Sequence, residues 1–124
     1  MKDKIVRLLL ADDADAMRGA IRQVLSAQPG ITLLGEARSF GEIMRMTATL
    51  KPDVVVMDIH MPGERDFAPD LIKTQLLSSA RHVLAMSVWN DDESKSLAQS
   101  YGAATLLDKS TLASELVPTI LQFS

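Results

Sequence analysis

The stretch VVVMDIHMPG, residues 54–63, decides the fold of this chain. It opens with four aliphatic residues and no polar alternation, which is typical of a strand buried on both faces of a parallel sheet. Asp58 follows this apolar run directly. A carboxylate is therefore expected at the end of a buried strand. Taken alone, Asp58 could equally be an ordinary turn residue.

Similar apolar runs alternate with stretches of helical period along the whole chain. The predicted strands are residues 5–11, 32–37, 54–57, 83–86 and 105–107. Five repeated strand–helix units predict an α/β fold, with a parallel sheet covered by helices on both faces.

The sequence also marks the ends of the predicted helices. These signals are Pro29-Gly30 after the first helix, Ser39 and Pro52 around the second, Pro69 at the start of the third, Asn90 and Gly102 around the fourth, and Ser110 near the start of the fifth. Leu71 and Leu121 are expected to face inward from the third and fifth helices. Pro118 should kink the fifth helix, because its ring clashes with a carbonyl one turn back.

Composition limits the classes of function that this chain can have. Its 124 residues are 47% hydrophobic and 23% charged, as expected for one folded domain. A net charge of -3 argues against a basic nucleic-acid surface, and the lack of cysteine excludes disulfides and thiolate sites. No apolar run has membrane-spanning length and no signal-peptide core is present, so we expect a cytoplasmic protein without a membrane partner.

Polar side chains follow four of the predicted strands. Asp12 and Asp13 come after the first, Asp58 after the third, Ser87 after the fourth and Lys109 after the fifth. Each alone has an ordinary explanation as a helix cap, a turn residue, a loop hydroxyl or a solvated charge. Because the ligand crevice of an open parallel sheet lies outside the carboxyl ends of its strands, we expect all five to share one pocket.

The residue types in this pocket predict its chemistry. Three carboxylates repel one another unless a cation is present, and Mg²⁺ is the hard cation that carboxylates and phosphates commonly bind. Asp58 is the expected nucleophile toward phosphorus, and Lys109 is expected to stabilise charge on the transferred oxygens. The Ser87 hydroxyl could reorient toward a new phosphoryl group, which would make the site a switch.

The motifs LLLADD, VVVMDIHMPG, LAMS and LLDKS, in this order and spacing, resemble the receiver domain of two-component response regulators. The resemblance covers essentially the whole chain, and QPGITLLGEA is similar to receivers joined to a LuxR-type helix-turn-helix output domain. It implies a doubly wound, flavodoxin-like sheet in the order 2-1-3-4-5 with five helices. Residues 1–124 would form the receiver, with the output domain absent from this chain.

The resemblance also implies function and partners. Asp58 would accept a phosphoryl group from a histidine kinase or a phosphotransfer protein, as the switch of a transcriptional regulator. DNA would be contacted only through the output domain, and a homodimer is compatible with the family. The chain would not be an enzyme for outside substrates but a phosphoacceptor that promotes its own phosphorylation and dephosphorylation.

Individual site residues take roles from the resemblance. Asp13 would bind Mg²⁺ directly, Asp12 mainly through water, and the main-chain carbonyl of His60 would be a further ligand. His60 and Trp89 lie where receivers control access of attacking water, so their bulk predicts slow dephosphorylation. Leu106 occupies the position where receivers usually carry a switch aromatic, which puts the usual coupling of hydroxyl and aromatic in doubt.

Three alternatives remain open at this stage. A hydrolase of the haloacid-dehalogenase type would also use an aspartyl nucleophile, but it needs a second acid where His60 stands. A pseudo-receiver would bind partners without being phosphorylated, although such sequences usually lose the acids or the lysine that are present here. A stand-alone receiver would act through protein–protein contacts without an output domain.

Overall fold

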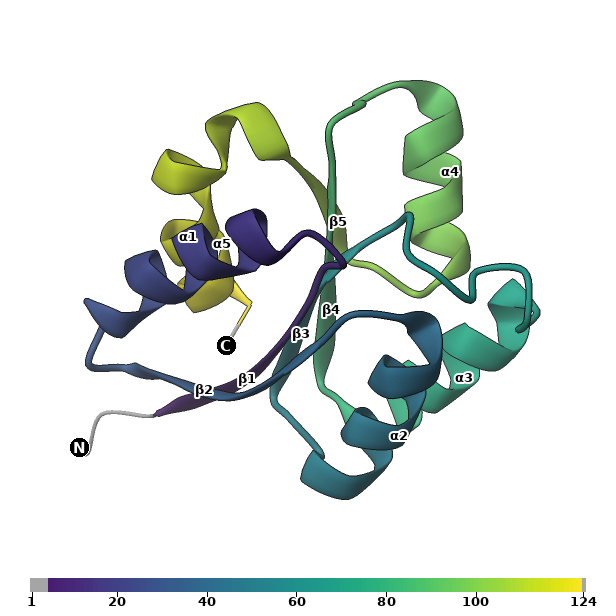
Figure 1. Ribbon diagram of the computed structural model, residues 1–124, viewed down its shortest axis with the longest axis horizontal. Coiled ribbons are helices and arrows are strands. Elements are labelled where there is room, and N and C mark those ends of the chain that lie inside the picture. The colour runs from purple at the N-terminus through teal and green to yellow at the C-terminus, as the bar shows by residue number, and fades with distance from the viewer. Residues whose placement is uncertain (1–4, 124) are drawn as a thin grey trace.

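The computed structural model describes residues 5–123 and contains one parallel sheet between two layers of helices (Figure 1). The strands are β1 (Val6–Ala11), β2 (Ile31–Ala37), β3 (Val54–Asp58), β4 (His82–Ser87) and β5 (Thr105–Asp108). The helices are α1 (Asp15–Ser26), α2 (Phe40–Leu50), α3 (Pro69–Ser79), α4 (Asp92–Ser100) and α5 (Leu112–Gln122), with a 3₁₀ turn at Lys109–Thr111. The strand order β2-β1-β3-β4-β5 confirms the predicted topology.

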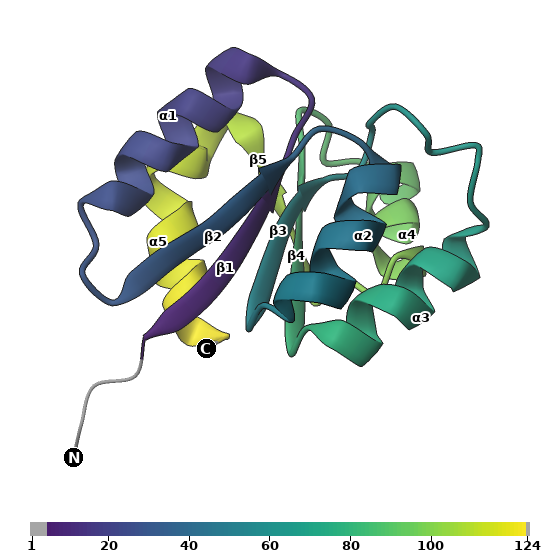
Figure 2. The ribbon, with the colours of Figure 1, turned by 60° about the horizontal axis from the view of Figure 1, so that its bottom comes forward.

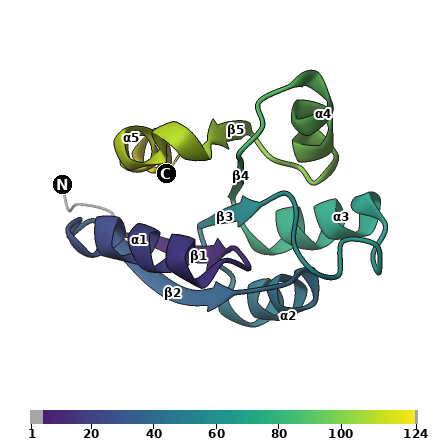
Figure 3. The same cartoon turned by 45° about the horizontal axis from the view of Figure 1, so that its top comes forward.

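Two hydrophobic cores lie on the two faces of the sheet. Helices α1 and α5 cover one face, and α2, α3 and α4 cover the other (Figures 2 and 3). Neighbouring residues of a strand enter different cores: Leu8 packs on the α1 side and Leu9 on the α2 side. Full burial of one such side chain stabilises the fold by about 1.5–3 kcal/mol.

Strand β3 lies at the centre of the sheet, which explains its unbroken apolar sequence. All five of its residues are buried. It pairs in register with β1 and β4, so that Ala11 is opposite Met57 and Asp58 is opposite Met86. The carboxyl ends of these strands therefore meet at one edge of the sheet, as the sequence predicted.

A bulge interrupts the pairing of β1 with the edge strand β2. Leu8 pairs with Leu33, but Leu9 pairs with Gly35, so Leu34 is an extra residue. Leu33 packs with the α1 side core, whereas a Cβ added at Gly35 would meet Met46 of α2 at 2.7 Å. After the bulge, the alternation of β2 side chains between the two helix layers is therefore reversed.

Several predicted helix ends are confirmed. The Ser39 hydroxyl caps α2 by accepting a hydrogen bond from the Glu42 N–H at 3.1 Å. The Glu42 carboxylate accepts from the Arg38 N–H at 2.7 Å, one residue before the cap. Pro69 is in the first turn of α3, and Gly102, with φ at 86°, follows the end of α4.

One cap was predicted one residue too early. Asp91, not Asn90, is the N-cap of α4, and its carboxylate accepts a hydrogen bond from the Ser94 N–H at 2.8 Å. Both residue types are strong caps, so sequence alone did not separate them.

Two of the predicted inward positions were also wrong. Leu71 and Leu121 are 53% and 50% exposed, because the adjacent residues Ile72 and Ile120 occupy the buried stripes of their helices. Helix α5 continues past Pro118 to Gln122. The kink there remains a prediction.

Among the described residues, no helix is both long and apolar enough to cross a membrane.

Candidate functional site

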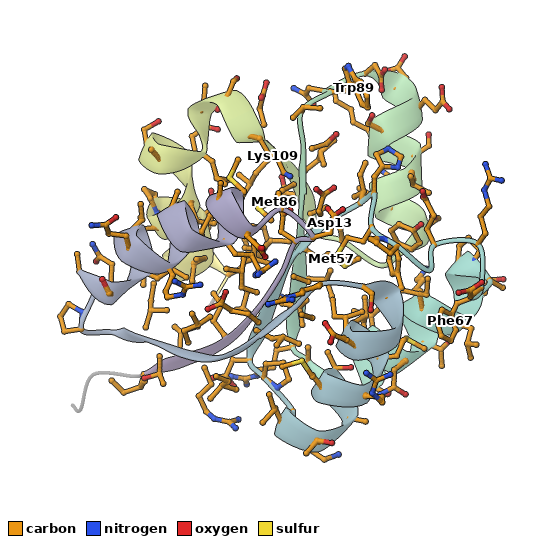
Figure 4. The ribbon with its side chains drawn as sticks, viewed as in Figure 1. Asp13, Met57, Phe67, Met86, Trp89 and Lys109 are labelled. Atoms are coloured by element: carbon orange, nitrogen blue, oxygen red, sulfur yellow. The ribbon has the colours of Figure 1, made fainter. Side chains whose placement is uncertain are left out.

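The carboxyl ends of the strands carry the polar residues that the sequence singled out. Asp12 follows β1, Asp58 ends β3, Ser87 ends β4 and Lys109 follows β5. Figure 4 labels Asp13 and Lys109, which follow β1 and β5 at this end of the sheet. The parallel topology thus brings together residues from distant parts of the chain.

Asp12, Asp13 and Asp58 form a compact acidic cluster. Each contributes one carboxylate oxygen, and these three oxygens lie within 4.8 Å of one another. Asp12 and Asp58 are buried, whereas Asp13 is exposed to solvent. Oxygen donors at this spacing, with one open side, could hold a hard divalent cation together with water or a phosphate oxygen.

Lys109 joins two members of this cluster. Its Nζ donates to Asp12 Oδ2 at 2.7 Å and to Asp58 Oδ2 at 2.5 Å. Burial alone would lower the pKa of Lys109, but the bonds to the two carboxylates outweigh it and raise this pKa above its usual value. The ammonium is therefore charged at neutral pH, and it contacts two of the three acids of the cluster.

Asp58 experiences opposing influences on its ionisation. Burial raises the pKa of its carboxyl, and the nearby Asp12 adds to this effect. The Lys109 ammonium and the His60 N–H, which donates to Asp58 Oδ1 at 2.8 Å, lower the pKa but do not cancel the rise. Ionised Asp58 is thus incompletely compensated, and an added cation would stabilise it.

Every polar group of Asp12 has a partner within the protein. Oδ1 accepts from the Ala14 N–H at 2.9 Å, and the Asp12 N–H donates to the Ala37 carbonyl at 3.0 Å. Its carbonyl accepts from Arg18 Nη1 at 2.8 Å. These contacts, with the Lys109 bond, fix Asp12 in one orientation.

Arg18 was not recognised from the sequence as part of this region. It is 4% exposed and lies on the buried face of α1 with Ile21 and Leu25. The spacing of these three residues, at i, i+3 and i+7, was the available signal. It places a charged side chain within an apolar stripe, which requires a polar partner inside the fold.

Ser87 and two bulky neighbours complete the site. The Ser87 side chain is buried, and its Oγ accepts from the Trp89 N–H at 3.0 Å. The rings of His60 and Trp89 meet edge to face at 6.3 Å, and His60 Nδ1 lies 3.4 Å from Glu64 Oε2. His60 and Trp89 line a cavity of about 290 Å³ with residues at the start of α4.

The position expected to carry a switch aromatic holds an aliphatic side chain instead. Leu106 is partly buried and packs against the core on the α2 side. Tyr101 lies in that same core, 2% exposed, with its ring 5.2 Å from that of Phe40. Tyr101 is therefore held in the core rather than placed on the surface.

Fold and sequence together define the class of this protein. The sequence model of the response regulator receiver domain matches residues 8–121, so the chain belongs to that family. In Bacillus subtilis (strain 168), the transcriptional regulatory protein LiaR is 31% identical over 116 residues, which are 94% of this chain and 54% of LiaR. The nitrate/nitrite response regulator protein NarL of Escherichia coli (strain K12) is 30% identical over 93% of this chain and 53% of NarL. The chain spans about half the length of these curated relatives.

Solved structures support the same assignment. The signal receiver domain of the putative response regulator NarL from Mycobacterium tuberculosis matches with a TM-score of 0.83 at 24% identity, covering 96% of this chain and 95% of that one. A LuxR-family two-component response regulator from Aurantimonas sp. SI85-9A1 matches with a TM-score of 0.82 at 26% identity, covering 96% and 84%. The flavodoxin-like receiver fold and the similarity to LuxR-type receivers are confirmed.

Proposed function

We propose that this chain is a phosphorylation-controlled switch in which Asp58 accepts a phosphoryl group from the phosphohistidine of a histidine kinase or a phosphotransfer protein. The observation that carries the proposal is the double contact of Lys109 with Asp12 and Asp58 inside a cluster of three carboxylates. A lysine held there is suited to stabilise negative charge on transferring phosphoryl oxygens.

The transfer needs one bond to form and one to break. A carboxylate oxygen of Asp58 attacks phosphorus, the P–N bond to the donor imidazole breaks, and the product is an aspartyl phosphate. The imidazole leaves with the electron pair of that bond and takes up a proton. Because Asp58 must attack as a carboxylate, positive charge that favours its ionised form also favours the reaction.

Mg²⁺ is the metal that we infer for the acidic cluster. The side chains of Asp13 and Asp58 and the main-chain carbonyl of His60 would hold it directly, and Asp12 would do so mainly through water. The ion would supply positive charge beside the phosphoryl oxygens. Three carboxylate oxygens within 4.8 Å and a single nearby lysine support a divalent cation here.

Ser87 is the residue that we infer to report the new phosphoryl group. Its hydroxyl is buried at the end of β4 and accepts a hydrogen bond from the Trp89 N–H, so its reorientation would change the start of the β4–α4 loop. We infer that His60 and Trp89 shield the aspartyl phosphate from water. The chain would thus promote its own phosphorylation at this site. It would also promote its own slow dephosphorylation there, with water as the acceptor of the phosphoryl group.

The parent protein is inferred from its relatives. Similarity to LiaR and NarL supports a cytoplasmic transcriptional regulator that contacts DNA through an output domain. A homodimer is compatible with this function. A stand-alone or phosphorylation-independent receiver is the alternative. It is less favoured, because the acids and the lysine of the site are all present and in contact.

Intact-mass spectrometry tests the proposal directly. The wild-type chain is incubated with Mg²⁺ and acetyl phosphate, which supplies the phosphoryl group. A phosphoryl adduct is expected for the wild type and for Asp70→Asn, which changes an acid in the first turn of α3. Asp58→Asn should form none. Equal adduct formation by the wild type and Asp58→Asn would refute the assignment.

A further inference from the structure

Arg18 is a buried cation that none of the steps above uses. Its guanidinium makes three contacts with three different segments. Nη1 donates to the Asp12 carbonyl at 2.8 Å, Nε donates to Glu36 Oε1 at 3.1 Å, and Nη2 donates to Asp15 Oδ1. The planar guanidinium presents its donors in a fixed fork, so these three groups are held relative to one another.

The acceptor on Asp12 is the important one. The Asp12 carbonyl belongs to the peptide group that links Asp12 to Asp13, and a peptide group is planar. A hydrogen bond to that oxygen therefore fixes the direction in which the chain enters Asp13. The two residues on either side of this peptide group, Asp12 and Asp13, both contribute carboxylates to the acidic cluster.

The Glu36 carboxylate that Arg18 contacts on β2 is itself held by a second arginine. Glu36 lies on β2 with its side chain 22% exposed, and it also accepts from Arg22 at 2.6 and 2.9 Å. The Arg22 bonds and burial act in opposite directions on the pKa of Glu36, and the net effect lowers it, so this anchor is ionised at neutral pH. Arg18 thus connects a fixed anion on the sheet to the peptide group before Asp13.

We propose that Arg18 is a positioning residue for the divalent-cation site, acting through the Asp12–Asp13 peptide group. The proposal rests on the proposed function, since it takes the acidic cluster to be a metal site. Partners that orient metal ligands typically change metal affinity by about 10–100-fold when they are removed. A purely structural role, in which Arg18 only joins α1 to β2, would alter stability without altering that affinity.

The test is an Mg²⁺ titration of the ¹⁵N-labelled chain, followed by amide NMR, which reports binding and folding in the same spectra. Arg18→Met is expected to raise the dissociation constant about tenfold. The matched control is Arg22→Met, which also loses its bonds to Glu36 but makes no contact with Asp12. It should bind Mg²⁺ as the wild type does.

A second variant decides the question if Arg18→Met does not fold. Arg18→Lys keeps the charge between Asp15 and Glu36 but cannot make the three-way fork, so its affinity for Mg²⁺ should lie between those of the wild type and Arg18→Met. Wild-type affinity in every folded Arg18 variant, even with a lower melting temperature, would overturn the inference. If the wild type itself does not bind Mg²⁺, the proposed function fails instead, which is a distinguishable result.

Discussion

Lys109 Nζ lies 2.5 Å from Asp58 Oδ2, although the two residues are 51 positions apart in sequence. Each side chain is 10% exposed, so the pair is largely removed from water. Strand β4 separates β3 from β5 in the sheet, and the Lys109 side chain spans this distance at the sheet edge. The charge of each residue therefore stabilises the ionised form of the other.

Removing the lysine should destabilise the metal-free protein. Lys109→Met leaves Asp12 and Asp58 buried without their cation, and breaking such a pair typically costs about 3–5 kcal/mol. We expect a loss of about 3 kcal/mol in the free energy of unfolding, measured with urea in the presence of EDTA. Added Mg²⁺ should restore part of it, because a ligand of the folded state stabilises that state. Lys95→Met, on α4, is the control, and an equal loss there would contradict this account.

The raised pKa of Asp58 predicts a pH-dependent effect of Asp58→Asn. Burial makes the folded chain hold the Asp58 proton more tightly than the unfolded chain, in which the pKa of this carboxyl is near 3.8. Ionisation of Asp58 therefore costs stability, fully above the folded pKa and not at all well below 3.8. In EDTA, Asp58→Asn should melt at a higher temperature than the wild type at neutral pH, and the two should converge in acid. A gain independent of pH would point to another cause.

Lys51 ends helix α2 in a conformation that suits glycine. Its φ is 48°, in the left-handed region, and it is the only non-glycine residue with positive φ among those described. Lys51→Gly should raise the free energy of unfolding by about 0.5–1 kcal/mol, because glycine adopts this conformation without steric cost. Lys51→Ala keeps the Cβ and should bring no gain. Thermal or urea unfolding of the two variants measures the difference.

The N-cap of α4 can be tested with two adjacent substitutions. Asp91→Ala removes the carboxylate that accepts from the Ser94 N–H and should cost about 1 kcal/mol. Asn90→Ala, one residue earlier, should cost under about 0.5 kcal/mol. Urea unfolding at neutral pH compares them. Equal losses would mean that Asn90 shares the capping role.

The fold could be predicted because its signals are local. The apolar run of β3 has no alternation, which only burial on both faces explains, and Pro69 and Gly102 mark helix ends by backbone geometry. The acidic cluster could be predicted for a related reason. Once the strands are parallel, their carboxyl ends must meet, and Asp12 and Asp58 come with them.

The features that were missed depend on contacts between distant segments. Leu71 and Ile72 are both apolar, and only the packing of α3 shows which of them is buried. Asn90 and Asp91 are both good caps, and only the backbone decides between them. The stripe of α1 places Arg18 beside Ile21 and Leu25, but the pattern within α1 does not show that Glu36 of β2 is its partner.

The bulge at Leu34 determines where Glu36 points. Side chains of a strand alternate, so one extra residue sends every later side chain of β2 to the opposite helix layer. Glu36 consequently faces α1, where two arginines are within reach, and not α2. A deletion of Leu34 would thus disturb contacts between β2 and α1, beyond the edge strand itself. It would turn the Glu36 carboxylate away from Arg18 and Arg22. The buried Arg18 guanidinium would then lack this partner below the loop that carries the acidic residues.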